Sequence, residues 1–365
     1  MATPSTQIAA VVPPPGMSAT SIVVISNTHP VPKPDGGDVL IKLEYSGVCH
    51  SDLHSIMGGY TDEDRRCWSR GSRNGDQRQD NICLDLGAGV DEKLWMGQRV
   101  GIRLVLMGSS ASSSSSSSSG LTRACPNQRN AGANVPGTFQ QDPEYIVSPA
   151  IHVTKIPSKL SPDLAAPLLC AGIAMYSSIM KTNSRPGDWI AILGAGGGLG
   201  HMGVQIAAKK GLRVLAIDKG EKKRQLCISL GATEFLDFSK VDIVEAVKAS
   251  ASGLGAHAVI CTANGERAYE QSMQMLRPLG TLVCVGIPNV PFRLPATPFD
   301  MIVKGLRIVG NSAGTAKEMD ELLAMAVAGD VKAHIECYEL SDLLEVLGRL
   351  ERSEIEGRAV LKIPE

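Results

Sequence analysis

The feature that most constrains the fold is a regular alternation of strand-like and helix-like segments between Trp189 and Gly286. Short apolar runs are each followed by a longer segment with helical periodicity. The expected strands cover residues 189–193, 213–217, 234–238, 256–262 and 281–285, and the expected helices cover 199–210, 221–230, 241–250 and 266–276. This alternation predicts an α/β fold with a parallel, doubly wound sheet.

The first strand of this region, Ile190–Leu193, leads into a glycine-rich turn and then into a helix. Glycines let the backbone pass close to a pyrophosphate, and the free N–H groups at a helix start favour its charge. The strict G-x-G-x-x-G string is absent, because Leu199 occupies the last position counted from Gly194. An ordinary tight turn is the alternative. The candidate cofactor contacts are Gly194, Gly196, Gly197, Gly198, Leu199 and Gly200.

Asp218 closes the second strand, where a carboxylate can accept hydrogen bonds from both adenosine ribose hydroxyls. Such an acid repels a 2′-phosphate, so the sequence favours NAD over NADP. Lys219, Lys222 and Lys223 oppose that preference, since a lysine beside the ribose could accept the phosphate. In the alternative interpretation, Asp218 merely caps the following helix.

A chain of 365 residues is long enough for two cores, so we expect two domains. Its 36 basic and 37 acidic residues nearly cancel, which makes nucleic acid an unexpected partner. We find no basic leader before an apolar segment and no uninterrupted apolar run of spanning length, so we expect a cytoplasmic protein without a membrane partner. Nine cysteines, an odd number, indicate thiols or metal ligands rather than a disulfide framework.

Two segments lack a helical or strand period. Residues 61–97 include an arginine-rich stretch with scattered Gly, Ser and Asp, and we expect a loop there. The strand expected at residues 100–107 runs into eight consecutive serines, Ser112–Ser119. Such a tract cannot bury apolar surface, which predicts a mobile surface loop.

Three motifs together carry a family resemblance. They are Cys49-His50-Ser51-Asp52-Leu53-His54, the segment Ala166–Gly172 around Cys170, and the turn Gly194–Gly200. With them the chain resembles the zinc-dependent medium-chain alcohol dehydrogenases, particularly the tetrameric microbial branch. The resemblance implies a GroES-like β-barrel catalytic domain at residues 1–163, completed by 311–365, and a Rossmann dinucleotide-binding domain at 164–310.

The resemblance also implies an activity, the interconversion of a primary or secondary alcohol with its carbonyl compound by hydride transfer to NAD. In this family a zinc ion polarises the alcohol oxygen. Cys49 and Cys170 match two zinc ligands, and Ser51 matches the hydroxyl that takes the alcohol proton. His54 matches the residue that relays this proton, and Asp52 matches a carboxylate that orients the metal site.

Further matches extend the implied cofactor site. Lys223 aligns with a cofactor-contacting lysine, and Arg358 aligns with an arginine that pairs with the pyrophosphate; each could otherwise be a solvated surface charge. Gly286 lies at a strand end where the family uses main-chain groups against the nicotinamide. His201 and His257 match no ligand position, so we expect them to be ordinary surface or packing residues.

The zinc motifs depart from the family pattern. The third catalytic ligand is the histidine of a Gly-His-Glu motif, but this chain has no histidine between His54 and His152. Cys67 or an acid at 62–64 could substitute. If Trp68-Ser69-Arg70-Gly71 is encoded by TGG TCA CGA GGN, a shift of one base reads Gly-His-Glu, which suggests a frame change in the gene.

The second, structural zinc site of the family needs four cysteines. Anchored on Cys125, its spacing places the others at Ala111, Ser114 and Ser117. A hydroxyl is a far weaker zinc ligand than a thiolate, so we expect no structural zinc.

Three functions stay open at this point. The first is an NAD-dependent alcohol dehydrogenase acting on a small alcohol or carbonyl compound. The second is a zinc-independent relative of the quinone and enoyl reductases, and the third is a non-catalytic dinucleotide-binding protein with a decayed metal site. By resemblance we expect a homo-oligomer, a dimer or tetramer joined through edge strands near residues 281–309.

Overall fold

The computed structural model describes residues 4–11, 24–56, 79–86, 91, 95–102, 105–106, 129–130, 141–288 and 292–364. The chain divides into two compact units. The first unit comprises Met1–Cys170, Thr315–Leu323 and Ile335–Glu365, and the second comprises Ala171–Gly314 and Ala324–His334. The chain thus passes from the first unit to the second at 170/171, where the sequence suggested 163/164, and residues 324–334 group with the second unit.

The second unit is built on a six-stranded sheet with the order β13-β12-β11-β14-β15-β16. Every neighbouring pair in this sheet is parallel. The strands are β11 (Trp189–Leu193), β12 (Arg213–Asp218), β13 (Glu234–Asp237), β14 (Ala256–Cys261), β15 (Leu276–Cys284) and β16 (Arg307–Gly310). The chain leaves β11 towards β12 on one side and later returns to β14 on the other. This reversal creates the switch point at which such sheets bind ligands.

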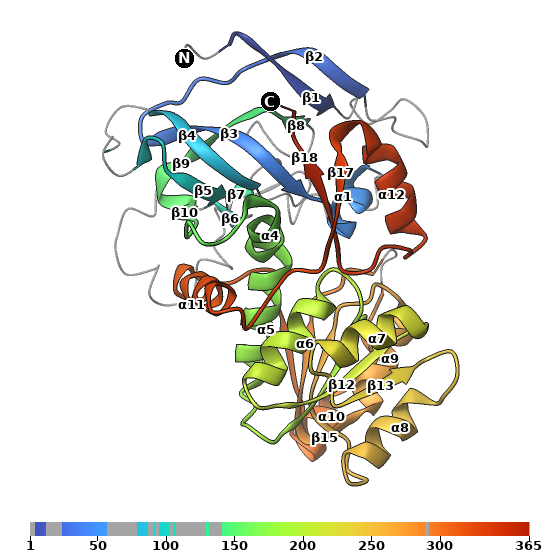
Figure 1. Cartoon of the computed structure of the whole chain (residues 1–365). Helices are drawn as coiled ribbons and strands as arrows, with labels where there is room; N and C mark the ends of the chain where they lie inside the picture. Colours follow the sequence, from blue (N-terminus) through green and yellow to red (C-terminus); the bar gives the residue numbers. More distant parts are fainter. Residues whose placement is uncertain are drawn as a thin grey trace. The chain divides into compact units, whose positions relative to one another are not determined.

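Helices cover the second unit's sheet (Figure 1). They are α6 (Gly200–Lys209), α7 (Glu221–Ser229), α8 (Ile243–Ser250), α9 (Glu266–Gln274) and α10 (Pro298–Lys304). The central strands read as largely apolar runs, since helices on both faces bury most of their side chains. Ala191, Leu215, Val259 and Leu282 are accordingly fully buried.

The first unit is mostly antiparallel β structure. Its largest sheet has seven strands in the order β10-β5-β4-β3-β18-β17, with β9 also paired to β3, while separate small sheets join β2-β1-β8 and β6-β7. The strands are β1 (Thr6–Val11), β2 (Val24–Pro30), β3 (Asp38–Gly47), β4 (Gln79–Leu86), β5 (Arg99–Ile102), β6 (Val105–Leu106), β7 (Arg129–Asn130), β8 (Gln141–Pro143), β9 (Tyr145–Pro149), β10 (Val153–Lys155), β17 (Ile335–Glu339) and β18 (Arg358–Lys362). The C-terminal strand β18 lies between β3 and β17, so the end of the chain completes a sheet begun near its start.

The remaining helices are α1 (His50–Ile56), α4 (Pro162–Pro167), α5 (Ile173–Thr182), α11 (Ala316–Val327) and α12 (Leu343–Glu351). A π-helical turn, Leu168–Gly172, joins α4 to α5. Within the described residues, this run Pro162–Thr182 is the one helical stretch with the length and apolar character of a membrane span. Since 83% of its apolar window is buried inside the protein, it is accounted for as a core helix.

Some element boundaries differ from those expected. Strand β4 lies within the segment 61–97 that was expected to be loop. Its sequence has no strand period, but pairing with β3 and β5 stabilises it as a strand. Strand β15 starts at Leu276 rather than at residue 281. The eight-serine tract lies outside the described residues.

Candidate functional site

The turn between β11 and α6 depends on its glycines. Gly194 has a φ of 75°, and a Cβ atom there would lie 2.6 Å from Thr262 Oγ1. A Cβ atom on Gly200 would lie 2.1 Å from the Gly194 carbonyl oxygen, which no backbone shift within the turn can relieve cheaply. On Gly197 the same contact is 3.4 Å, which is ordinary packing. Gly194 and Gly200 are therefore required by the turn's own packing.

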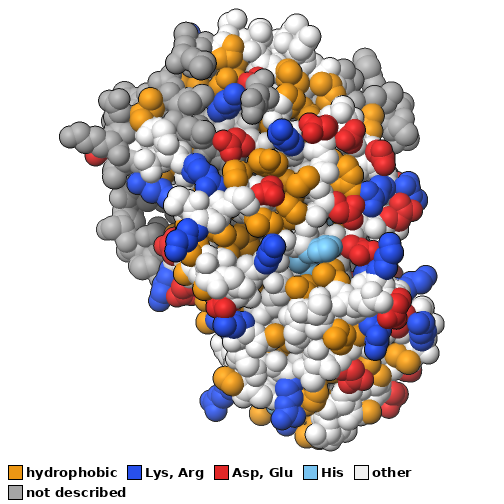
Figure 2. All heavy atoms as spheres, viewed as in Figure 1, with side chains coloured by type: hydrophobic (Ala, Val, Ile, Leu, Met, Phe, Trp, Pro, Cys, Tyr) orange, Lys and Arg blue, Asp and Glu red, His pale blue; other side chains and the backbone are white. Residues whose placement is uncertain are grey.

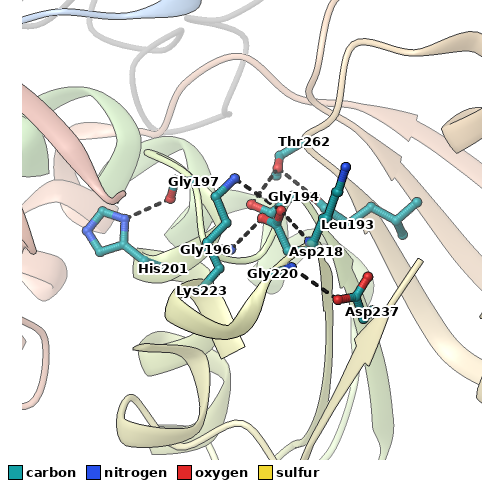
Figure 3. A network of polar contacts seen from close by, with 11 residues as sticks. Leu193, Gly194, Gly196, Gly197, His201, Asp218, Gly220, Lys223, Asp237 and Thr262 are labelled. Carbon is teal, nitrogen blue, oxygen red and sulfur yellow. Dashed lines mark hydrogen bonds and ion pairs between the residues drawn. The ribbon is translucent and has the colours of Figure 1, made fainter. Parts of the chain in front are cut away.

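Asp218 joins this turn to the end of β12 (Figure 3). Its carboxylate is 6% exposed and accepts hydrogen bonds from the amides of Gly196 at 2.9 Å and Lys219 at 2.8 Å. Helix α7 has Gly220 as its N-cap, and the Gly220 amide donates to Asp237 rather than to Asp218. The alternative in which Asp218 only caps this helix is therefore wrong.

Lys223 on α7 is the third partner of Asp218, with its Nζ 3.1 Å from Oδ1. Its aliphatic stem lies over Gly196, where an added Cβ would approach Lys223 Cβ to 2.7 Å. A carboxylate offers about four acceptor positions, and the backbone amides with Lys223 use three of them. The carboxylate therefore keeps capacity for a further donor, and more once Lys223 moves aside.

Gly286 follows β15 and lies against the end of β14. Its amide donates to the Cys261 carbonyl at 2.9 Å, and its carbonyl accepts a hydrogen bond from Tyr269. A Cβ atom on Gly286 would lie 2.2 Å from the Ala263 carbonyl oxygen. Thr262 Oγ1 in turn donates to the Leu193 carbonyl at 2.6 Å. Thr262 and Tyr269 support the carboxyl ends of the strands, and sequence reasoning missed both, because no motif marks them.

A second cluster lies in the first unit, at the start of α1. The Cys49 amide donates to Asp52 Oδ2 at 2.5 Å, and the Asp52 amide donates to the Cys49 carbonyl at 3.1 Å. Asp52 is 1% exposed and sits at the third helical position, so its side chain caps the helix start as in half of a capping box. Asp52 thereby fixes the backbone that carries Cys49. The side chain of His54 lies outside the described residues.

Cys170 meets Cys49 from the π turn. π turns occur frequently at functional sites, and this one begins directly after Pro167, which lacks an amide donor. Arg358 on β18 donates from Nη2 to Cys170 Sγ at 2.9 Å, and Arg358 is 3% exposed. Arg358 is thus not a solvated surface charge. Its pairing with a pyrophosphate stays a prediction.

Electrostatics in this cluster favour a thiolate. The hydrogen bond from Cys170 lowers the pKa of Cys49 well below its ordinary value; burial opposes this, and the Arg358 charge and hydrogen bonds from Ser51 add to it. The structure therefore brings Cys49, Ser51, Asp52, Cys170 and Arg358 together. The two buried thiols are suitable ligands for a soft metal ion, whereas the guanidinium beside them cannot bind a metal.

A zinc site needs at least three protein ligands. Among the described residues, no group of three His, Cys, Asp or Glu side chains could hold a metal ion. Cys67, Cys125 and the acids at 62–64 lie outside those residues. The described part of the chain thus supplies Cys49 and Cys170 and does not complete the site.

The two histidines without a family match differ in their surroundings. His257 is partly exposed near the amino end of β14, where it accepts a hydrogen bond from the Trp189 amide and lies 3.2 Å from Asp188. Burial lowers the pKa of His257, while Asp188 opposes that shift. His201 is fully buried and contacts the glycine turn through Gly197, so it is not a surface residue.

Two family models match the chain. The alcohol dehydrogenase GroES-like domain matches residues 35–158, and the zinc-binding dehydrogenase domain matches residues 198–328. Alcohol dehydrogenase 2 of Emericella nidulans is 38% identical over 99% of this chain and 98% of its own length. An alcohol dehydrogenase of Geobacillus stearothermophilus is 37% identical over 92% of this chain and 94% of its own.

Solved structures agree. Acetophenone reductase from Geotrichum candidum, in complex with NAD, superposes with a TM-score of 0.82 at 27% identity, covering 99% of this chain and 98% of that one. The alcohol dehydrogenase of Aeropyrum pernix gives 0.82 at 25% identity, with coverages of 98% and 99%. The chain therefore belongs to the zinc-type medium-chain alcohol dehydrogenase family, as its motifs predict, and combines that family's GroES-like domain with a Rossmann-like domain in an NAD-linked oxidoreductase of alcohols.

Proposed function

We propose that this chain transfers hydride between a small primary or secondary alcohol and NAD, with the pyrophosphate on the turn Gly194–Gly200 and the adenosine ribose on Asp218. The observation that carries the proposal is the buried Asp218 carboxylate, which is hydrogen-bonded to the Gly196 amide. That bond holds the Asp218 carboxylate against the glycine turn, at the switch point of the sheet. Gly198, Leu199 and Gly286 complete the proposed cofactor contacts.

Charge supports NAD over NADP. The Asp218 carboxylate would repel a 2′-phosphate placed on the same ribose. Lys223 does not offset this repulsion freely, because its ammonium group is already paired with Asp218 at 3.1 Å. Lys219 contacts Asp218 through its backbone amide.

At the substrate end, we propose Cys49 and Cys170 as two zinc ligands, with the third supplied from outside the described residues. We propose that Ser51 takes the alcohol proton, and its hydrogen bond to Cys49, which puts it beside the thiol pair, supports this role. We propose that His54, on the same short helix, relays that proton onward. Asp52 orients the cluster by holding the Cys49 amide, and Arg358 supplies a positive charge beside Cys170.

We propose the domain limits implied by the family, a catalytic domain at 1–163 completed by 311–365 around a nucleotide-binding domain at 164–310.

The distribution of surface charge supports a small-molecule substrate. On the described part of the face in Figure 2, acidic and basic side chains intermingle instead of forming a single-sign patch.

We also propose a homo-oligomer joined through the β16 edge of the parallel sheet. Helix α10, which precedes β16 in the chain and contacts β15, has no fully buried residue and carries Phe299, Ile302 and Val303 at exposures of 67%, 80% and 62%. Residues three and four apart share one helix face. An exposed apolar face next to an edge strand suits a second copy of the chain.

A zinc-independent reductase is the second candidate, and the Arg358 contact with Cys170 favours it. An arginine can neutralise a thiolate that would otherwise need a metal. Such an enzyme would reduce carbonyl compounds with NADH after all metal has been removed.

The test combines three measurements on the purified full chain. Fluorescence titration with NADH measures cofactor binding, the production of NADH from NAD measures alcohol oxidation, and elemental analysis measures zinc per chain. We expect saturable NADH binding with alcohol oxidation. Binding without any turnover would make the chain a non-catalytic dinucleotide-binding protein, and absence of binding would remove the oxidoreductase proposal altogether.

A further inference from the structure

His201 uses both ring nitrogens inside the second unit. Its Nδ1 lies 2.9 Å from the Gly197 carbonyl oxygen, and its Nε2 lies 3.2 Å from the His334 amide nitrogen. An amide can only donate, so Nε2 accepts and Nδ1 must carry the proton. The ring is therefore neutral, and it donates to Gly197. Because His201 is fully buried, no water competes for either bond.

Gly197 is the residue on which the glycine turn closes (Figure 3). Its amide donates to the Gly194 carbonyl at 3.1 Å, and its carbonyl accepts from both the amide and the ring of His201. A peptide group is planar, so a fixed Gly197 carbonyl also fixes the direction of the Gly198 amide. That amide is one of those proposed to meet the pyrophosphate.

The opposite side of the ring binds the segment Lys332–His334, through which the chain leaves the second unit; we call it the connecting segment. One turn after His201, Gln205 accepts from the Lys332 amide and donates to the Lys332 carbonyl, each at 2.9 Å. His201 then binds the amide of His334, the last residue of the second unit before the chain enters the first at Ile335. The same face of α6 thus holds the glycine turn and the connecting segment.

We propose that His201 is a positioning residue for the cofactor pyrophosphate. Its neutral imidazole holds the peptide between Gly197 and Gly198 in the orientation that presents the Gly198 amide to a phosphate. The inference rests on the proposed NAD site and adds a residue that touches neither substrate nor cofactor. An ordinary packing histidine would tolerate any substitute of similar size, whereas this role needs a donor at the Nδ1 position.

Two conservative substitutions separate these roles. In His201→Asn the side-chain amide occupies the place of Nδ1 and can donate to Gly197, whereas in His201→Gln the polar group reaches the place of Nε2 and can accept from His334. Loss of one hydrogen bond in a buried site corresponds to about a tenfold change in binding. We expect His201→Gln to raise the Kd for NADH about tenfold and His201→Asn to change it less than about twofold.

Gln205→Met is the matched control, because it removes both bonds to Lys332 and the bond from Gln205 Nε2 to the His201 backbone carbonyl, but keeps the His201 ring and its bond to Gly197. We expect it to lower the melting temperature without changing the Kd for NADH. At saturating NAD, His201→Gln should have the same kcat as the unsubstituted chain, since the substitution weakens only cofactor binding. Equal Kd values for the two His201 variants, or an equal loss in Gln205→Met, would overturn the inference. Failure of the unsubstituted chain to bind NADH would instead remove the proposed function, and this inference with it.

Discussion

At the scale of single residues, Asp218 offers the sharpest test of cofactor choice. In Asp218→Asn the side chain keeps its size but loses its charge and its ion pair with Lys223. Hydrogen bonds to charged groups contribute about 1.5–3 kcal/mol, so we expect NADH binding to weaken by roughly 10- to 100-fold. NADPH binding should weaken less, because the repulsion of its 2′-phosphate is removed. Fluorescence titration with both nucleotides measures this ratio.

The control for that variant is Glu245→Gln on the exposed face of α8. Glu245 is 70% exposed and pairs with Lys248 on the same helix, and it has no part in the proposed cofactor site. We expect no change in either Kd. An unchanged ratio of NADH to NADPH affinity in Asp218→Asn would contradict the proposed contact with the ribose.

The glycine turn gives a second prediction through two alanine substitutions. Gly200→Ala would place a Cβ atom 2.1 Å from the Gly194 carbonyl, whereas Gly197→Ala meets the same atom at 3.4 Å. We expect Gly200→Ala to lose about 2–4 kcal/mol of unfolding free energy, in the range of severe steric substitutions. Gly197→Ala should keep native stability. Thermal unfolding of both variants checks this, and equal melting temperatures would show that the turn can relax.

Part of this site, the glycine turn with Asp218, could be predicted from the sequence alone. The glycine turn and Asp218 lie within one strand-turn-helix-strand unit, so local pattern is enough to find them. The Arg358 contact joins residues 188 positions apart, and the His201 contact joins residues 133 positions apart. Neither pair carries a local signal, because side-chain pairing across such distances is set by the folded chain. His201 was accordingly expected to be an ordinary residue.

At the scale of elements, the alternation of strands and helices correctly predicted the parallel sheet of the second unit. It could not predict the π turn Leu168–Gly172, whose sequence reads as an ordinary apolar helix. It also could not find β4, since that strand is stabilised by pairing with β3 rather than by its own residues. Element type thus follows from periodicity, while irregular elements follow from tertiary contacts.

The strand β18 supports a prediction about the first unit. Truncation after Gly357 removes this strand from its place between β3 and β17, together with Ala359, Val360 and Leu361, which are at most 1% exposed. Each large apolar side chain contributes about 1.5–3 kcal/mol when buried, and a domain is stable by only about 5–15 kcal/mol. We expect the first unit to be unfolded in this variant. Limited proteolysis followed by mass spectrometry identifies the cleaved unit.

A truncation after Ile363 is the matched control, since it leaves β18 whole. We expect its proteolysis pattern to equal that of the full chain. If the shorter chain resisted proteolysis equally well, β18 would not be needed to complete the sheet.

At the scale of the whole molecule, zinc content tests the two metal sites at once. The structural site keeps one cysteine of four by the family spacing, and the described residues bring together only two catalytic ligands, Cys49 and Cys170. We expect at most one zinc per chain, and none in the Cys49→Ser, Cys170→Ser double variant. Elemental analysis measures this, and two zinc ions per chain would contradict it. Transcript sequencing across Trp68 tests separately whether the missing histidine is encoded in another frame.

The exposed apolar residues of α10 lead to a prediction about the oligomeric state of the whole molecule. Helix α10 packs Met301, which is partly buried, against the core of the second unit, but it leaves Phe299, Ile302 and Val303 exposed, so most of its apolar surface gains nothing from the folding of an isolated chain. A second copy packed against Phe299, Ile302 and Val303 would supply that gain. Ile302→Glu places a charge on this face, and burying an unpaired charge costs several kcal/mol. We expect the variant to dissociate while its Kd for NADH stays unchanged.

Light scattering after gel filtration measures the mass of each species. Leu344→Glu on α12 is the control, because Leu344 is also exposed, at 55%, but lies on the first unit. It should leave the mass unchanged, which would show that a new surface charge alone does not dissociate the protein. A full chain that is already monomeric, or an Ile302→Glu variant that stays assembled, would contradict the proposed interface. Either result would leave the fold and the cofactor site intact, since neither depends on α10.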